Sequence, residues 1–400
     1  MIGLRRILFW MHLTAGILAG TVILVMSVTG MLLAFQRQIT SFADRRTIPA
    51  VTPQPVENAP NIEELLQQVA LQAQAAPTAV TLYNQDDQPI QIELGRERVL
   101  FVDPCSGKTI GEGSSAVRQF FRSVTGWHRW LGMRTESRSS GRFITGLCNL
   151  IFLGIVLSGF CLWLPRKWSW QNVRSVLFYR RGLPGKAREF NWHNVTGIWC
   201  AIPLIMMVAT ATVLSFTWAN NLLYRATGNQ PPPVERSLTA VRQQGAQRST
   251  ANAPGLAKYD ALVFSGLNVP LLRAKNQAPG WRIITMRLPA DENPASITFT
   301  IISGNPGRPD QRAQLVLAHN SGELIRWEPF TAYNAGRKLR AWFRFIHTGE
   351  AGGIIGQTIA ALASTGAAFL MCTGTILAIR RLMAARARRR NQYAGAQAAD

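Results

Sequence analysis

Charged residues are scarce in this sequence, and acidic ones are the scarcest. Asp, Glu, Lys and Arg make up 16% of its 400 residues, against about 25% in an average soluble domain. The 21 acidic residues are outnumbered by 43 Lys and Arg, which leaves a formal net charge of +22. The four longest apolar runs contain no Asp or Glu. A soluble domain is therefore not the expected class of protein. If the apolar runs cross a membrane, a metal-permeation pathway is disfavoured, because the runs contain no carboxylate to bind a metal ion.

Cysteine and nucleotide-binding motifs are also lacking. The chain has 5 cysteines and no CxxC pair, so it has no CxxCH site for covalent haem attachment. Cys105 is the one cysteine outside the apolar runs, which excludes a disulfide within either segment between them. Glycines between Gly349 and Gly356 lack the GxGxxG spacing and follow no expected strand, so they do not indicate a phosphate-binding loop.

What the chain does have is apolar length, with 47% hydrophobic residues. Four runs approach or exceed the ~18–20 residues needed to cross a bilayer, and they are roughly Ile7–Phe35, Phe143–Leu164, Val195–Trp218 and Ile354–Ile379. The first run is longer than the ~7–15 apolar residues of a signal peptide, so we expect it to be a retained helix. The sequence predicts an integral membrane α-helical protein with four transmembrane helices.

The positions of the basic residues predict the orientation of these helices. They cluster before the first run (Arg5 and Arg6), between the second and third runs (166–188) and after the fourth run (380–390). If the four helices alternate, all three clusters lie on one side, which the positive-inside rule assigns to the cytoplasm. The two long segments, Gln36–Arg142 and Ala219–Gly353, are then expected to lie outside. The basic charge is explained by topology and by the lipid bilayer, so no nucleic acid partner is expected.

The chain is internally repetitive. When His12 is aligned with His193, the apolar run that follows each histidine matches the other without a gap, with Gly16 on Gly197, Ile17 on Ile198 and Phe35 on Phe216. This match indicates duplication of a two-helix unit.

Each long segment also predicts a small α+β domain. In the first, Asn61 is expected to cap a helix, and strand-like runs lie at 78–83, 90–94, 98–102 and 108–110. In the second, a helix is expected at 257–264 and strands at 281–287, 296–302, 313–318 and 323–327. Both domains contain a turn with Ser-Gly, which follows Asp103 in the first and His319 in the second.

Four of the five histidines fall in duplicated positions. His12 and His193 are expected near the cytoplasmic face, whereas His128 and His347, in aromatic amphipathic stretches, are expected near the outer face. A membrane histidine is costly without a partner, and two imidazoles with no further ligand suggest the axial positions of a haem. A zinc site would need more ligands. The alternative is that each histidine is an interfacial polar residue capped by a carbonyl. His319 is expected to be a surface or turn residue.

The expected organisation is as follows: a transmembrane helix at 1–36, a periplasmic domain at 37–116, an interfacial helix and second transmembrane helix at 117–165, a basic cytoplasmic loop at 166–192, a third transmembrane helix at 193–219, a second periplasmic domain at 220–336, an interfacial helix and fourth transmembrane helix at 337–380, and a basic cytoplasmic tail at 381–400.

Five pieces of the sequence resemble the PepSY-associated transmembrane family, which includes iron-regulated inner-membrane proteins and haem-containing ferrisiderophore reductases. They are FWMHLTAG at Phe9–Gly16, FVDPCSG at Phe101–Gly107, WHRWLG at Trp127–Gly132, WHNVTGIW at Trp192–Trp199 and FIHTGEAGG at Phe345–Gly353. The resemblance implies that the periplasmic domains are of the PepSY type. It also implies two haem b groups, whose ligands are His12, His193, His128 and His347.

Two functions are compatible with these features. The first is a haem-dependent oxidoreductase that passes electrons from a cytoplasmic or quinol donor across the membrane and reduces a ferric siderophore in the periplasm, releasing Fe(II). The second is a non-enzymatic membrane regulator whose PepSY-like domains bind a peptide or protein partner. No residue stands out in the sequence as catalytic.

Overall fold

The structure of the protein is a computed structural model that describes residues 2–49, 61–85, 87–165, 168–231, 264–288 and 295–397. The chain divides into two compact units. The helical unit comprises Met1–Phe35, Arg122–Asn220 and Phe343–Asp400, and the sheet unit comprises Gln36–Phe121 and Asn221–Trp342.

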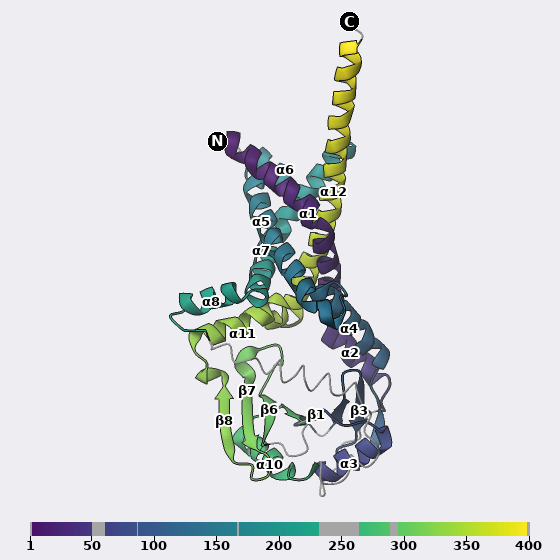
Figure 1. Ribbon diagram of the computed structural model, residues 1–400, viewed down its shortest axis with the longest axis vertical. Coiled ribbons are helices and arrows are strands. Elements are labelled where there is room, and N and C mark those ends of the chain that lie inside the picture. The colour runs from purple at the N-terminus through teal and green to yellow at the C-terminus, as the bar shows by residue number, and fades with distance from the viewer. Residues whose placement is uncertain are drawn as a thin grey trace. The chain divides into compact units, whose positions relative to one another are not determined.

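Four long helices form the helical unit, namely α1 (Ile2–Leu33), α5 (Arg138–Trp163), α7 (Gly185–Ser215) and α12 (Gly353–Gln397). Each packs against two others, in the cyclic order α1, α5, α7, α12 (Figure 1). Four segments are long and apolar enough to cross a membrane: Gly3–Leu33, Ser115–Trp163, Gly185–Ser215 and Glu350–Arg388. The predicted multi-pass membrane protein with four transmembrane helices is therefore confirmed.

The helices are longer than the apolar runs that predicted them. α12 continues through most of the expected basic tail, because Ala and Arg both favour helix there. α7 starts at Gly185, directly after Pro184, within the expected basic loop. That loop also contains the short helix α6 (Trp170–Leu177), capped by the hydroxyl of Ser169.

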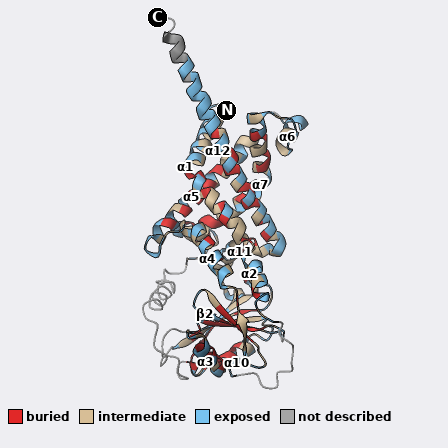
Figure 2. Ribbon diagram, turned by 90° about the vertical axis from the view of Figure 1, so that its right-hand side faces the viewer, coloured by how far each residue is buried: buried red, intermediate tan, exposed pale blue. Residues whose placement is uncertain are grey.

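Small and polar side chains lie at the contacts between these helices. Buried alanines on α1 and α12, such as Ala19 and Ala367, allow the two helices to approach closely (Figure 2). Between α5 and α7, the Asn149 amide donates to the carbonyl of Val208 and to the hydroxyl of Thr212, each at 3.0 Å. These bonds supply polar groups with partners that lipid cannot offer.

The sheet unit contains one eight-stranded antiparallel sheet. Its strands are β1 (Ala79–Tyr83), β2 (Ile90–Leu94), β3 (Arg98–Val102), β4 (Thr109–Glu112), β5 (Ile283–Arg287), β6 (Ser296–Ile302), β7 (Arg312–Ala318) and β8 (Leu324–Pro329). The spatial order is β4-β3-β2-β1-β5-β6-β7-β8. Each of the eight predicted strands is present, with ends shifted by at most two residues.

The expectation of two separate outer domains is corrected by the pairing of β1 with β5. These strands pair from Ala79 with Arg287 to Tyr83 with Ile283, and the hydroxyls of Thr81 and Thr285 lie 3.0 Å apart across the join. Two four-stranded meanders therefore merge into one sheet. Merging satisfies the backbone groups of two strands that would otherwise be exposed edges.

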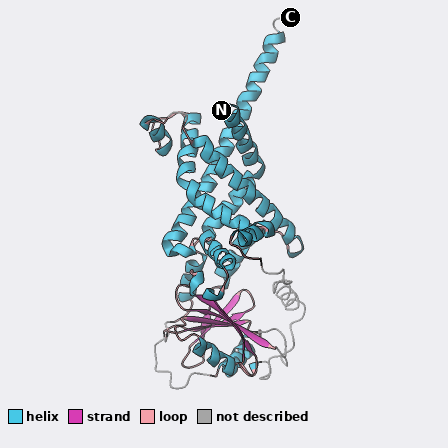
Figure 3. Ribbon diagram, turned by 90° about the vertical axis from the view of Figure 1, so that its left-hand side faces the viewer, coloured by secondary structure: helices cyan, strands magenta, loops and turns pink. Residues whose placement is uncertain are grey.

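Two helices cover one face of this sheet (Figure 3). They are α3 (Ile62–Ala73), capped by Asn61 as predicted, and α10 (Asn268–Gln277). Their apolar residues share one core with both meanders, including Leu66, Ile92, Ile284 and Phe299. The helix expected at 257–264 lies outside the described residues, apart from its last residue.

Four shorter helices flank the long helices and the sheet, namely α2 (Gln36–Arg45), α4 (Ser115–Trp130), α8 (Thr217–Ala226) and α11 (Ala335–His347). In the sheet unit, Arg118 at the start of α4 forms an ion pair of 2.6 Å with the buried carboxylate of Asp44 on α2.

Both predicted Ser-Gly turns are present. Gly107 and Gly322 have φ values of +69° and +64°, which glycine adopts without strain. The Asp103 carboxylate accepts from the backbone N–H of Cys105 at 2.9 Å, and this bond lowers the pKa of Asp103. His319 lies in its turn, as expected, but is buried with 8% exposure rather than on the surface.

Candidate haem-ligating histidines

The structure brings His12 and His193 together within the helical unit. His12 is on α1 and His193 is on α7. Their ring centres are 6.4 Å apart and the ring planes are inclined at 86°. We call these two residues the first histidine pair.

Both rings of the first pair are oriented by a hydroxyl on a neighbouring helix. His12 Nδ1 lies 3.0 Å from the Ser158 hydroxyl on α5, and His193 Nδ1 lies 2.9 Å from the Thr373 hydroxyl on α12. Each hydroxyl donates its own proton to a backbone carbonyl one turn earlier in its helix. The hydroxyl therefore accepts from Nδ1–H, and in the neutral imidazole Nε2 keeps the lone pair that binds a metal.

His128 on α4 and His347 on α11 form the second histidine pair. Each ring bonds to a carbonyl that lies 14 residues after a member of the first pair on the same helix, Met26 on α1 and Met207 on α7, so the two rings lie at one level of the helical unit. His128 Nδ1 lies 3.1 Å from the carbonyl of Met26 and 3.0 Å from the hydroxyl of Thr29, and His347 Nδ1 lies 2.9 Å from the carbonyl of Met207. A carbonyl only accepts, so Nδ1 is again the protonated nitrogen and Nε2 is again available.

Glycines make room for three of the four rings. A Cβ added to Gly159 would lie 3.2 Å from Cε1 of His12, and one added to Gly374 would lie 3.4 Å from Cε1 of His193. In the second pair, a Cβ at Gly30 would lie 3.4 Å from His128. These positions are therefore close-packed against the imidazoles, which restricts their rotation.

The partners of the second pair were missed by sequence reasoning, although a signal exists. The alignment that places His12 on His193 also places Met26 on Met207 and Thr29 on Thr210. The two apolar runs therefore share the motif M-x-x-T at matched positions. The role of this motif could not be predicted from the sequence, because Met contacts the histidine through its backbone carbonyl.

The first pair has the composition that a haem site would need, namely two imidazoles on separate helices, with ring centres 6.4 Å apart. Among the described residues, no group of three or more His, Cys, Asp and Glu side chains could hold a metal ion. One turn after His12, a Cβ at Gly16 would meet no atom within 4 Å, so the described residues do not fill the space beside it.

The two pairs lie at different levels of the helical unit. His12 precedes Met26 by 14 residues on α1, and His193 precedes Met207 by 14 residues on α7. At 1.5 Å per residue, each interval is about 21 Å along the helix. This distance is most of the ~30 Å thickness of the hydrocarbon core.

The end of the helical unit nearer the first pair is basic. The Arg5 guanidinium donates to a carbonyl at the end of α5, and Arg380 on α12 forms an ion pair of 2.8 Å with the buried Glu189 on α7. Arg381 lies over the ring of Phe9, with Cζ 4.7 Å from its centre. Arg5 at the start of α1 and Arg380 and Arg381 on α12 therefore lie at the same end of the helical unit.

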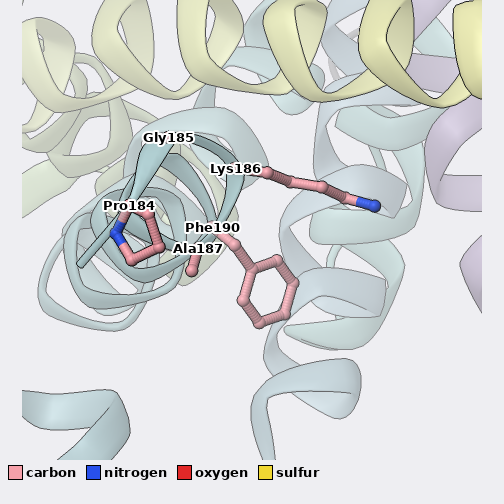
Figure 4. A pocket seen from close by; sticks show the side chains of 5 residues that line it. All are labelled: Pro184, Gly185, Lys186, Ala187 and Phe190. Carbon is pink, nitrogen blue, oxygen red and sulfur yellow. The ribbon is translucent and has the colours of Figure 1, made fainter.

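A pocket with a volume of about 610 Å³ lies at the start of α7 (Figure 4). It is lined by Pro184, Gly185, Lys186, Ala187 and Phe190, and its surface is mostly apolar. Phe190 precedes His193 by less than one helical turn, so the pocket and the first pair are supported by the same part of α7.

Comparison with protein-family models identifies the family of the chain. No curated protein matches the chain significantly. The model of the family described as "PepSY-associated TM region" matches residues 9–381, a span that includes all four paired histidines. The chain therefore belongs to the PepSY-associated TM region family.

Proposed function

We propose that this protein is a transmembrane di-haem electron-transfer protein that reduces a ferric siderophore in the periplasm and thereby releases Fe(II). In chemical terms, one electron from a cytoplasmic or quinol donor converts the Fe(III) of the chelate to Fe(II). Siderophores favour Fe(III), so reduction weakens the complex. The protein would be a haem-dependent oxidoreductase of the bacterial inner membrane.

One observation carries the proposal: all four paired histidines donate from Nδ1 and leave Nε2 available. A single interfacial histidine capped by a carbonyl would make the same bond, so the support lies in its recurrence at four positions that the repeat pairs across helices. Second-shell bonds of this kind fix the orientation of metal-binding imidazoles.

The residues of the chain would hold two haem b groups, one at each histidine pair. Haem bound in this way supplies reversible one-electron transfer. His12 and His193 would provide the axial nitrogens at the first pair, and His128 and His347 would provide them at the second. The hydroxyls of Ser158 and the equivalent threonine on α12 would hold the first pair in position and increase its basicity.

The orientation is supported by the charge distribution. The basic end of the helical unit, which includes Arg5, Arg380 and Arg381, would face the cytoplasm by the positive-inside rule. The first pair is then nearer the cytoplasmic face and the second nearer the periplasmic face. The sheet unit would lie in the periplasm.

The proposal is tested by a reduced-minus-oxidised absorption spectrum of the detergent-purified protein, with haem quantified as pyridine haemochrome. About two haem b groups per chain are expected. H12A/H193A and H128A/H347A should each lose one group and keep the other, because the two pairs are held by different contacts. H319A is the matched control, since His319 is a histidine of the sheet unit outside both pairs and should leave the haem content unchanged.

A protein without a Soret band, or one whose band survives replacement of all four histidines, contradicts the proposal. In that case, the alternative of a non-enzymatic regulator that binds a peptide or protein through the sheet unit becomes the leading one. If haem is present, reoxidation of the reduced protein by ferric chelates distinguishes a reductase from a haem protein of another kind.

A further inference from the structure

Three arginines converge beside the second histidine pair. Arg129 directly follows His128 on α4, and Arg344 precedes His347 by one turn on α11. Arg142 lies near the start of α5. His128 and His347 bond to carbonyls at matched positions of α1 and α7, so Arg129 and Arg344 lie at one level of the helical unit. The charges of Arg142 and Arg344 also act on the guanidinium of Arg129.

Two of these arginines are brought together by a single hydroxyl. The side-chain oxygen of Thr145 lies 3.1 Å from the carbonyl of Arg129 and 3.1 Å from the carbonyl of Arg142. Gly141 packs directly against the backbone of Trp130, where a Cβ would overlap its carbonyl. The end of α4 therefore packs onto the start of α5, which holds the backbones of Arg129 and Arg142 close together.

The three guanidinium groups are not neutralised by the protein. All three residues are exposed. Within the described part of the chain, no carboxylate lies within 4.0 Å of Arg129, Arg142 or Arg344, whereas five other arginines form ion pairs. Three like charges held together without a counter-ion repel one another, so an anion bound between them would be favoured.

The cluster departs from the pattern that relates the two halves of the helical unit. Arg129 directly follows His128, and the residue that directly follows His347 is Thr348. Arg344 lies three residues before His347, and the residue three before His128 is Thr125. The histidines and their hydroxyl and carbonyl partners follow the repeat, as expected for groups that hold two equivalent cofactors. The arginines are found once, which indicates a task performed at one site only.

We propose that Arg129, Arg142 and Arg344 form a binding site for an anionic, carboxylate-bearing ferric chelate beside the second histidine pair. Guanidinium groups bind carboxylates through paired, charge-assisted hydrogen bonds, which a neutral hydroxamate chelate does not offer. A chelate held there lies next to the histidines from which it would be reduced. This inference rests on the proposed function and adds the class of substrate to it.

The test measures binding without redox chemistry. Gallium(III) citrate serves as a redox-inert anionic probe and the gallium complex of ferrichrome as a neutral one, in equilibrium dialysis against the full-length protein in phosphatidylcholine nanodiscs. R129Q, R142Q and R344Q should each weaken gallium citrate binding by about 10-fold or more, as expected for loss of a charge-assisted hydrogen bond. The neutral complex should be unaffected. R134Q removes one exposed arginine from the adjacent loop and is the matched control, so it should bind gallium citrate as the unaltered protein does.

Three other outcomes overturn the assignment. Equal gallium citrate binding by all four variants shows that the cluster does not hold the chelate. Loss of haem from R129Q or R344Q, measured as pyridine haemochrome, shows that the arginines hold haem propionates instead. Displacement of gallium citrate by phosphatidylglycerol in the nanodisc shows that lipid headgroups occupy the site. If the unaltered protein lacks haem but binds gallium citrate through these arginines, the anion site stands and the proposed redox function fails.

Discussion

Replacing Thr373 by valine should selectively weaken haem binding at the first histidine pair. The hydroxyl of Thr373 accepts from His193 Nδ1 at 2.9 Å, and the residue is 4% exposed. Valine has nearly the same shape, so the packing around the ring is kept and the hydroxyl alone is lost. Water has little access to replace it, and Nδ1–H is left with the backbone carbonyl of Leu370 as its acceptor.

The expected loss follows from the role of such second-shell bonds. Removing one typically costs 10–100-fold in affinity for the bound metal group, which corresponds to about 1.4–2.8 kcal/mol of binding free energy. The second pair does not contact Thr373 and should keep its haem.

Transfer of haem to excess apomyoglobin is a suitable assay, because the two sites should then release haem at different rates. In T373V, half of the bound haem should leave at least 10-fold faster than in the unaltered protein, and S158A should behave similarly through His12. T375V is the matched control, since the hydroxyl of Thr375 bonds only to the carbonyl of Met371 in its own helix among the described residues. If T373V releases haem no faster than T375V, the Nδ1 bond does not support a ligand and the reasoning is refuted.

Three further predictions concern the framework around the site. R118A should destabilise the sheet unit by about 3–5 kcal/mol, because the buried carboxylate of Asp44 loses its charged partner and keeps the bond from the backbone N–H of Ser114. Proteolysis in a urea series measures this loss, and the double variant with D44A should lose less. Arg337 donates two hydrogen bonds to Glu328, and these bonds lower the pKa of the Glu328 carboxyl. The pair therefore stabilises the folded protein fully above the ordinary pKa of 4.5, and this stabilisation is lost as the pH falls through the lower pKa of the folded state. The same urea series at decreasing pH should therefore show a steeper loss for the unaltered protein than for E328Q. G141V should displace the end of α4 and remove haem from the second pair but not the first, which the pyridine haemochrome content will show as a fall from two groups to one.

Equal urea midpoints for R118A and the unaltered protein would contradict the view that this pair stabilises the sheet unit. An E328Q variant with the same acid sensitivity as the unaltered protein would remove Glu328 from the account. Full haem content in G141V would show that the second pair does not depend on the contact of α4 with α5.

The sequence by itself determined the parts of this protein that depend on local pattern. Apolar length predicted the four transmembrane helices, alternation predicted the strands, and the Asn61 cap and the two Ser-Gly turns followed from backbone preferences of single residues. The paired histidines were also evident, because the repeat placed His12 opposite His193 without any knowledge of packing. These features arise from neighbours along the chain.

The tertiary structure decided what depends on distant contacts. The joining of β1 to β5 could not be predicted, because either meander alone satisfies the alternation of its strands. The partners of the histidines depend on the rotation of each helix about its axis, which brings the carbonyl of Met26 to His128 and the hydroxyl of Thr373 to His193. The convergence of the three arginines likewise needs α4, α5 and α11 in place, since nothing in the spacing of 129, 142 and 344 indicates that their charges meet.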